Sequence, residues 1–388
     1  MSAPPTIELG LRVGPGWPPA APAHLMRALR RVEVTQQDAA PCGFQLTFLA
    51  ELVALGSSFE IVGDPLLAPF SRVLLRAAVN GQPTTLIDGF VTHHQYVPGN
   101  GPEDSLFVVT GEDVSVAMDL VDYSREFPAL PDAATVATVL APWLALGLVP
   151  EVMPSATSLV PADYVPQQAE TDRALLQRLA RSNGNVFYVT PTAEPYVNTA
   201  YWGPPWRSGG PSAVLDVAVG AASTADSFSA EYDALAPVTY FGLSSLEEIA
   251  PSPPIPILTF ESTRTPPLAA RPALGLGSSL LTSRKALWRE DQLDPVRANL
   301  RAQAMTDCST DAVVTVRCGV RPARLGQVVS APGIVGVRGT GEAYDGLYYL
   351  KSATHAISLL AEQEWDYAQQ LTLTREGVGT TTTTLVAA

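Results

Sequence analysis

The sequence predicts an α+β protein that is mainly β, with two small β-barrel domains bracketing an α/β insertion. Three observations support this fold class. Apolar and polar side chains alternate along several segments of residues 1–122, a helical spacing of apolar residues replaces that alternation over residues 123–205, and the alternation returns in residues 292–377. With 388 residues, of which 46% are hydrophobic, the chain is long enough to form two or three hydrophobic cores.

The predicted first barrel contains clear strand patterns. Residues 44–52 alternate apolar and polar side chains, as half-buried strands do, and residues 73–79 repeat this pattern. Asn80 and Gly81 follow, and they are the residue types that a two-residue type I′ turn requires. We therefore expect residues 84–96 to form the returning strand of a hairpin. The remaining predicted elements of this unit are a strand over residues 106–110 and a short helix over residues 113–121.

The insertion begins with an uncharged stretch, residues 133–150, which is long enough to be considered as a membrane span. It contains prolines and is flanked by acidic residues rather than by lysine or arginine, so a span is not favoured. We instead predict a buried helix over residues 133–146, which Asp132 caps and Gly147 ends. A strand near residues 148–153 follows.

The second helix of the insertion, residues 171–182, has both of its ends marked. Thr171 is a suitable N-cap, and Asp172 places a negative charge near the positive end of the helix dipole. Gly184 is a natural left-handed C-cap, and the β-branched and aromatic residues 185–190 predict a strand directly after it. The apolar stripe of this helix comprises Leu175, Leu176, Leu179 and Ala180.

The remainder of the chain returns to strand patterns. Strands within residues 206–250 are expected to rejoin the first barrel. Residues 251–291 are rich in proline, which cannot donate a ladder hydrogen bond, so they predict a connector outside any sheet. Residues 292–377 predict a helix followed by the second β-barrel, and the low-complexity residues 378–388 predict a flexible tail.

The charge and cysteine content argue against several classes of protein. The chain has 38 acidic and 24 basic side chains, and lysine occurs only at Lys285 and Lys351, so stable nucleic-acid binding is not expected. The three cysteines, Cys42, Cys308 and Cys318, include no C-x-x-C pair, so they predict neither a disulfide framework nor a zinc site. The N-terminus lacks the pattern of a secretory signal, so we expect a cytoplasmic protein without a membrane anchor.

Few residues are candidates for catalysis. His93 and His94 are adjacent, and because consecutive strand residues point to opposite faces, they could not readily share a metal ion. Glu362, Glu364 and Asp366 share one strand face, where they could form a glycosidase-like carboxylate cluster, a solvated face or the lining of a channel. No nucleophile-elbow, zinc-protease or phosphate-loop motif occurs. We therefore predict no catalytic, cofactor-binding or metal-binding residue.

A longer pattern runs through residues 167–191. Its residues are Gln168, Glu170, Thr171, Asp172, Leu175, Leu176, Arg178, Leu179, Ala180, Gly184 and Phe187. This pattern resembles the signature of the late-control-D family, which includes the hub proteins of contractile phage tails and the hub half of the VgrG spikes of type VI secretion. Residues 346–358 resemble a strand pair of the same family, with His355 as a structural, hydrogen-bonded residue, and residues 371–375 resemble its closing strand.

The resemblance implies a structural baseplate hub of a contractile injection apparatus rather than an enzyme. Such a hub is a homotrimer whose six barrels form a ring that joins the central spike to the sixfold inner tube. The implied partners are a separately encoded spike protein, inner-tube or tube-initiator proteins and baseplate wedge proteins, assembled in the cytoplasm of a bacterium into a phage tail-like particle. The spike is expected to be separate because VgrG chains continue into a needle, whereas this sequence ends shortly after Gly377.

Two questions stay open from the sequence. The particle could be a phage tail, or an extracellular or cytoplasmic injection system. The alternative function is a carbohydrate-active, β-rich enzyme that uses the acidic residues Glu362, Glu364 and Asp366.

Overall fold

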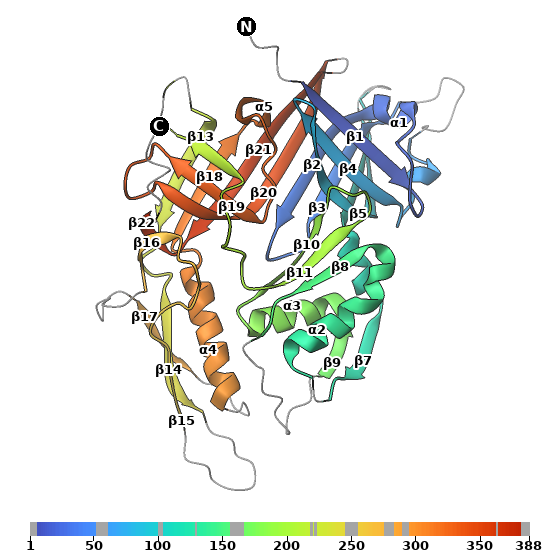
Figure 1. The fold of residues 1–388 in the computed structure, drawn as a ribbon. Coiled ribbons are helices and arrows are strands. Elements are labelled where there is room, and N and C mark those ends of the chain that lie inside the picture. The colour runs from blue at the N-terminus through green and yellow to red at the C-terminus, as the bar shows by residue number, and fades with distance from the viewer. Residues whose placement is uncertain are drawn as a thin grey trace.

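The chain folds into a large curved β-sheet, an α/β insertion below it and a lobe of one small sheet and one long helix beside the insertion (Figure 1). The mainly-β class is therefore confirmed. The computed structural model describes residues 6–51, 61–99, 104–128, 130–155, 167–217, 220, 223–244, 255–274, 283–288, 295–361 and 364–381.

The first half of the large sheet is antiparallel throughout. Asn80 and Gly81 both have positive φ angles, 52° and 75°, so the predicted type I′ turn is confirmed. Buried apolar residues from one sheet face form the first core together with the short helices α1 (Ala23–Ala28) and η1 (Pro65–Leu67). The strands, in spatial order, are β1 (Ile7–Gly14), β4 (Arg72–Val79), β5 (Gln82–Val97), β6 (Leu106–Asp113), β3 (Gly43–Leu49) and β2 (Leu29–Gln37).

The second half of the large sheet has its own core, which includes Val316, Leu350 and Leu373. One connection in it is parallel, because β12 (Ala213–Asp216) pairs in parallel with β19 (Gly333–Arg338). The other strands, in spatial order, are β20 (Gly346–Ala361), β21 (Glu364–Arg375), β18 (Val314–Val320) and β13 (Ala225–Tyr232), and the short helix α5 (Pro322–Leu325) follows β18.

The long hairpin of β20 and β21 joins the two halves. Leu350 on β20 packs in the second core, whereas Ile357 on the same strand packs in the first, together with Tyr367 on β21. Hydrogen bonds between β2 and β20 make the whole sheet continuous. Among the described strands this sheet ends at β1, at β13 and, on a branch beside β19, at β12, and it contains no closed barrel. Two separate barrel domains are therefore not confirmed.

The prediction that strands within residues 206–250 rejoin the first barrel was wrong. β12 pairs with β19 and β13 pairs with β18, so both strands belong to the second half of the sheet and not to the first. The next strand, β14 (Val238–Ser244), leaves the large sheet and enters the lobe. Alternation along a strand shows which side chains share a face, but it does not show which strand lies beside it.

The insertion has a three-stranded sheet with helices on one face and a separate two-stranded sheet (Figure 1). Asp132 is the first residue of α2 (Asp132–Leu140), not its cap, because Pro131 occupies the N-cap position. Gly147 ends this helical segment with a φ of 85°, as predicted. No helix in the described ranges is long and apolar enough to span a membrane. The elements are η2 (Val114–Asp119), β7 (Asp122–Glu126), α2 (Asp132–Leu140), η3 (Ala141–Leu146), β8 (Leu148–Val152), β9 (Gln167–Thr171), α3 (Asp172–Ser182), β10 (Val186–Pro191) and β11 (Asn198–Gly203).

Strands occupy two regions that the sequence predicted to lie outside any sheet. In the proline-rich connector, Pro256 lies on β15 (Ile255–Leu258), an edge strand of the lobe, where a missing backbone N–H is tolerated. In the predicted tail, β22 (Gly377–Thr380) pairs with β16 (Ala269–Pro272), so the first residues of that tail are held by a ladder. The lobe is completed by β17 (Arg284–Trp288) and α4 (Pro295–Thr310).

Candidate interaction surface

One face of the lobe sheet exposes a row of apolar side chains. Phe241 on β14 lies opposite both Leu258 on β15 and Leu287 on β17. These three side chains are 44%, 51% and 51% exposed, and Leu243, farther along β14, is 62% exposed. We name these four residues the lobe face. A contiguous apolar surface of this kind is typical of a site that contacts another protein.

The opposite face of the lobe sheet packs on α4. Ile257 and Trp288 are buried against Ala298 and Ala302 of the helix, and Tyr240 packs beside them. Because side chains alternate along a strand, this burial forces the residues of the lobe face to point away from α4. The small alanine side chains allow the helix to lie close to the sheet.

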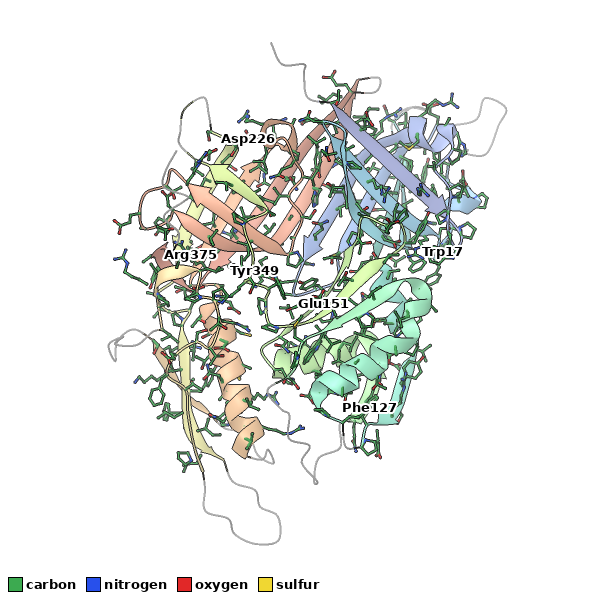
Figure 2. All side chains as sticks on the ribbon, in the orientation of Figure 1. Trp17, Phe127, Glu151, Asp226, Tyr349 and Arg375 are labelled. Carbon is green, nitrogen blue, oxygen red and sulfur yellow. The ribbon has the colours of Figure 1, made fainter. Side chains whose placement is uncertain are left out.

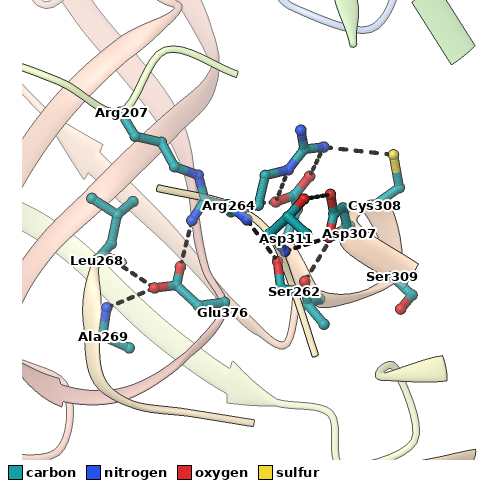
Figure 3. Close-up of polar contacts among 12 residues, drawn as sticks. Arg207, Ser262, Arg264, Leu268, Ala269, Asp307, Cys308, Ser309, Asp311 and Glu376 are labelled. Atoms are coloured by element: carbon teal, nitrogen blue, oxygen red, sulfur yellow. Dashed lines mark hydrogen bonds and ion pairs between the residues drawn. The ribbon is translucent and has the colours of Figure 1, made fainter. Parts of the chain in front are cut away.

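A buried network of ion pairs anchors the lobe to the rest of the protein (Figure 3). Arg264 donates to both carboxylate oxygens of Asp311, with Nε–Oδ1 and Nη2–Oδ2 distances of 3.1 and 2.8 Å. Arg207, in the segment after β11, donates to Asp311 and also to Glu376, which follows β21. The side chains of Arg207 and Arg264 are only 2% and 6% exposed, so the pairs are shielded from solvent.

Three backbone N–H groups complete this anchor. Glu376 accepts hydrogen bonds from the backbone N–H groups of Leu268 and Ala269, at the start of β16. Asp307 on α4 accepts from the backbone N–H and the hydroxyl of Thr263. The network therefore fixes the base of the lobe through both charge pairs and backbone contacts, which keeps the lobe face in a defined position.

The end strands β13 and β1 of the large sheet are a second candidate contact. β13 has β18 as its only described partner strand, so its other edge is unpaired among the described strands. At the opposite end, β1 pairs with β4 on one edge, and its other edge is bridged only at Arg12, to Ala20. Unpaired backbone groups on such edges can accept a strand from another chain.

Two of the histidines considered from the sequence, His355 and His94, form hydrogen bonds within the fold. His355 is fully buried on β20, and its Nδ1 lies 2.8 Å from the hydroxyl of Tyr367. Burial lowers the pKa of His355 to about 3. On β5, His93 is exposed, whereas His94 is half-buried and donates from Nε2 to the carbonyl of Leu67. His355 is thus the hydrogen-bonded strand residue that the sequence resemblance implied.

The acidic residues do not form a carboxylate pair in the described part of the chain. Glu364 is exposed, and Asp366 accepts from Arg321, which also pairs with Asp226. Glu362 lies outside the described residues. Within those residues, no group of three or more His, Cys, Asp and Glu side chains is placed to hold a metal ion. The three thiols are free, with Cys42 and Cys318 buried and Cys308 exposed.

Neither a protein-family model nor a curated protein matches this sequence. Solved structures of similar fold do match it. The tail protein from Neisseria meningitidis MC58 is 14% identical with a TM-score of 0.62, covering 96% of this chain and 98% of that one. The 43 kDa tail protein of prophage MuSo2 from Shewanella oneidensis is 12% identical with a TM-score of 0.63, covering 96% and 99%. This chain has the tail-protein fold.

A protein of a type VI secretion system has a similar fold. The E. coli c3393 protein, described as a component of the type VI secretion system with structural similarity to the T4 tail proteins gp27 and gp5, is 10% identical. Its TM-score is 0.55, and the alignment covers 89% of this chain and 73% of that one. The predicted likeness to phage-tail and type VI secretion proteins is therefore confirmed for the fold.

The signature residues of the insertion serve packing within the tail-protein fold. Asp172 is buried and accepts hydrogen bonds from Gln168, Arg125 and the indole of Trp143. Thr171 caps α3 by accepting from the backbone of Ala174, as predicted. Each polar residue of this part of the signature thus has a structural partner.

Sequence reasoning missed the anchor and the lobe face. Arg207 and Glu376 are 169 positions apart, and no local pattern shows that they meet. The lobe face had one available signal, because Phe241 and Leu243 are apolar residues at two-residue spacing on the side opposite Tyr240. Apolar residues on both sides of this strand show that both of its faces are apolar. In a small lobe only one face can pack on the helix, so the other face indicates a contact with another protein.

Proposed function

We propose that this chain is a non-enzymatic structural baseplate hub of a contractile injection apparatus. The observation that carries the proposal is the match of nearly the whole chain to tail proteins of Neisseria and Shewanella, with TM-scores of 0.62 and 0.63. The type VI component from E. coli supports the same class of assembly. The work of such a protein is geometric, since it would hold other components at fixed positions and transmit force through buried contacts.

The hub would act as a homotrimer that joins a central spike to a sixfold inner tube. Each chain has two sheet halves with separate cores, so three chains would present six similar β units around an axis. Subunits would meet through the lobe face and the outer edges of β1 and β13. The partners would be a separately encoded spike protein, inner-tube or tube-initiator proteins and baseplate wedge proteins, in a particle assembled in the cytoplasm of a bacterial producer.

The mass of the purified protein in solution tests the trimer. Light scattering after size-exclusion chromatography should give three times the chain mass of 41.1 kDa. Phe241→Ser combined with Leu258→Ser should shift the mass toward one chain, because both side chains lose apolar contact area. Leu360→Ser is the matched control, since Leu360 is 66% exposed on β20 and lies outside the lobe. A wild-type protein that stays monomeric with its spike protein present would refute the trimer.

A further inference from the structure

Three neighbouring clefts form one groove where the insertion, the lobe and the large sheet meet. Their volumes are about 240, 220 and 260 Å³. The first and second share Asn185 and Arg264 in their walls, and the second and third share Asp38 and Lys351. Tyr349 lies at the middle of the groove, between the large sheet and the insertion (Figure 2). This elongated shape suits an extended chain better than a compact ligand.

Two cations line the central cleft without a close counter-ion. Arg181 is in the last turn of α3, and Lys351 is on β20. Neither forms an ion pair within 4 Å in the described part of the chain, although Lys351 acts on Asp38 from farther away. The other acid of this cleft, Asp311, is already held by Arg207 and Arg264. In a chain with a net charge of -14, a concave site with two available cations is unusual.

Polar side chains also lie at both ends of the groove. In the first cleft, Arg207 is buried, and its Nε has no acceptor among the described residues. In the third cleft, the hydroxyl-bearing residues Thr315, Ser352 and Thr372 line the wall, and the hydroxyl of Thr315 donates to the carbonyl of Ala312. A groove lined by cations and hydroxyl-bearing residues favours a ligand that is rich in hydrogen-bond acceptors, such as carboxylates and backbone carbonyls.

We propose that this groove binds an extended acidic polypeptide segment of a partner protein, with Arg181 and Lys351 receiving its carboxylates. The proposal deepens the hub function, because it assigns a recognition site for a component that the hub would hold. A nucleic acid fits less well, since contact with a phosphate backbone needs several cations and the rest of this chain is acidic.

Fluorescence anisotropy with a short labelled polyglutamate peptide and the purified full chain tests the site. Lys351→Gln and Arg181→Gln should each weaken binding about tenfold, as expected for the loss of a charge-assisted contact. Lys285→Gln is the matched control, because Lys285 is the only other lysine and is exposed on β17, outside the groove. This variant should bind like the wild type, and a polyserine peptide should not bind.

The groove proposal fails if polyglutamate does not bind, if the two groove variants bind like the control, or if single-stranded DNA binds equally well. Measuring the solution mass of each variant keeps this test separate from the trimer. A trimer that does not bind the peptide would reject the groove and leave the hub in place. A monomer that binds the peptide through Arg181 and Lys351 would reject the trimer and leave the groove in place.

Discussion

The guanidinium of Arg72 and the carboxylate of Asp88 form a two-point ion pair inside the protein, with Nε–Oδ1 and Nη2–Oδ2 distances of 2.8 and 2.6 Å. Their side chains are only 2% and 1% exposed. Arg72 also donates to the carbonyl of Leu146 and packs against the rings of Trp17 and Tyr196. This pair therefore joins the first half of the large sheet to the insertion.

Arg72→Ala should lower the free energy of unfolding by about 3–5 kcal/mol, because it leaves the buried carboxylate of Asp88 without its counter-ion. Urea denaturation followed by circular dichroism measures this loss. Arg76→Ala, on the same strand, is the control. Arg76 is half-buried and makes partly exposed hydrogen bonds, so its loss should cost about 1 kcal/mol or less. Equal losses in the two variants would contradict a special role for the buried pair.

A second prediction concerns Asp38, whose side chain lies in the groove beside Tyr349 and Lys351, with Asp311 on the lobe side. Burial raises the pKa of Asp38 to about 6, above its ordinary value of 3.8. Ionisation is therefore harder in the folded state, and folding stability should fall as the pH rises from about 4 to above 6. Asp38→Asn removes that ionisation.

At pH 8, Asp38→Asn should therefore be more stable than the wild type by about 2–3 kcal/mol, and this difference should shrink below pH 4. Urea denaturation at a series of pH values measures the difference. Glu364→Gln, which removes an exposed carboxylate, controls for the change in net charge. A gain from Asp38→Asn that is the same at pH 4 and pH 8 would show that burial of the charge is not its cause.

Local features of this chain were predictable from sequence, and remote pairings were not. Thr171, Gly184 and the Asn80–Gly81 turn were predicted correctly, because each depends on backbone groups within a few positions. The partners of β12 and β13 lie about a hundred positions away, so the alternation that identified these strands could not assign them. The anchor of the lobe was missed for the same reason, since Arg207 and Glu376 meet only after the chain has folded.

The third prediction concerns Gly184, a position where two separate features of the structure require glycine. Its φ is +66°, and a Cβ there would lie 3.0 Å from both Cα and Cβ of Ala304 on α4. Gly184→Ala should therefore cost the αL strain of about 1 kcal/mol and an additional packing term. Gly16→Ala is the matched control, since Gly16 has a φ of +65° and nothing within 4 Å of a new Cβ.

Thermal or urea unfolding should show a larger loss for Gly184→Ala than for Gly16→Ala. Ala304→Gly, introduced into the Gly184→Ala chain, should restore part of the packing term, although glycine in a helix itself costs about 1 kcal/mol. A coupling energy of zero between the two positions would mean that contact between the end of α3 and α4 does not limit stability.

The last prediction concerns His355, whose neighbours oppose protonation. The ring is fully buried, Nδ1 lies near the hydroxyl of Tyr367 and the side-chain amide of Gln369, and burial lowers its pKa to about 3. The unfolded chain binds a proton at its ordinary pKa of 6.5, but the folded chain does not. The contribution of His355 to stability is therefore fully present above pH 6.5 and is lost as the pH falls toward 3.

This loss should amount to about 2–3 kcal/mol between pH 7 and pH 4.5, at 1.36 kcal/mol for each pH unit below 6.5. His355→Gln keeps a polar group near Tyr367 but cannot titrate, so the variant should be less stable at pH 7 and lose less stability on acidification. Because Asp38 acts in the opposite direction over part of this range, the comparison is cleanest in the Asp38→Asn background. If acidification destabilises both chains equally in that background, His355 is not the group responsible.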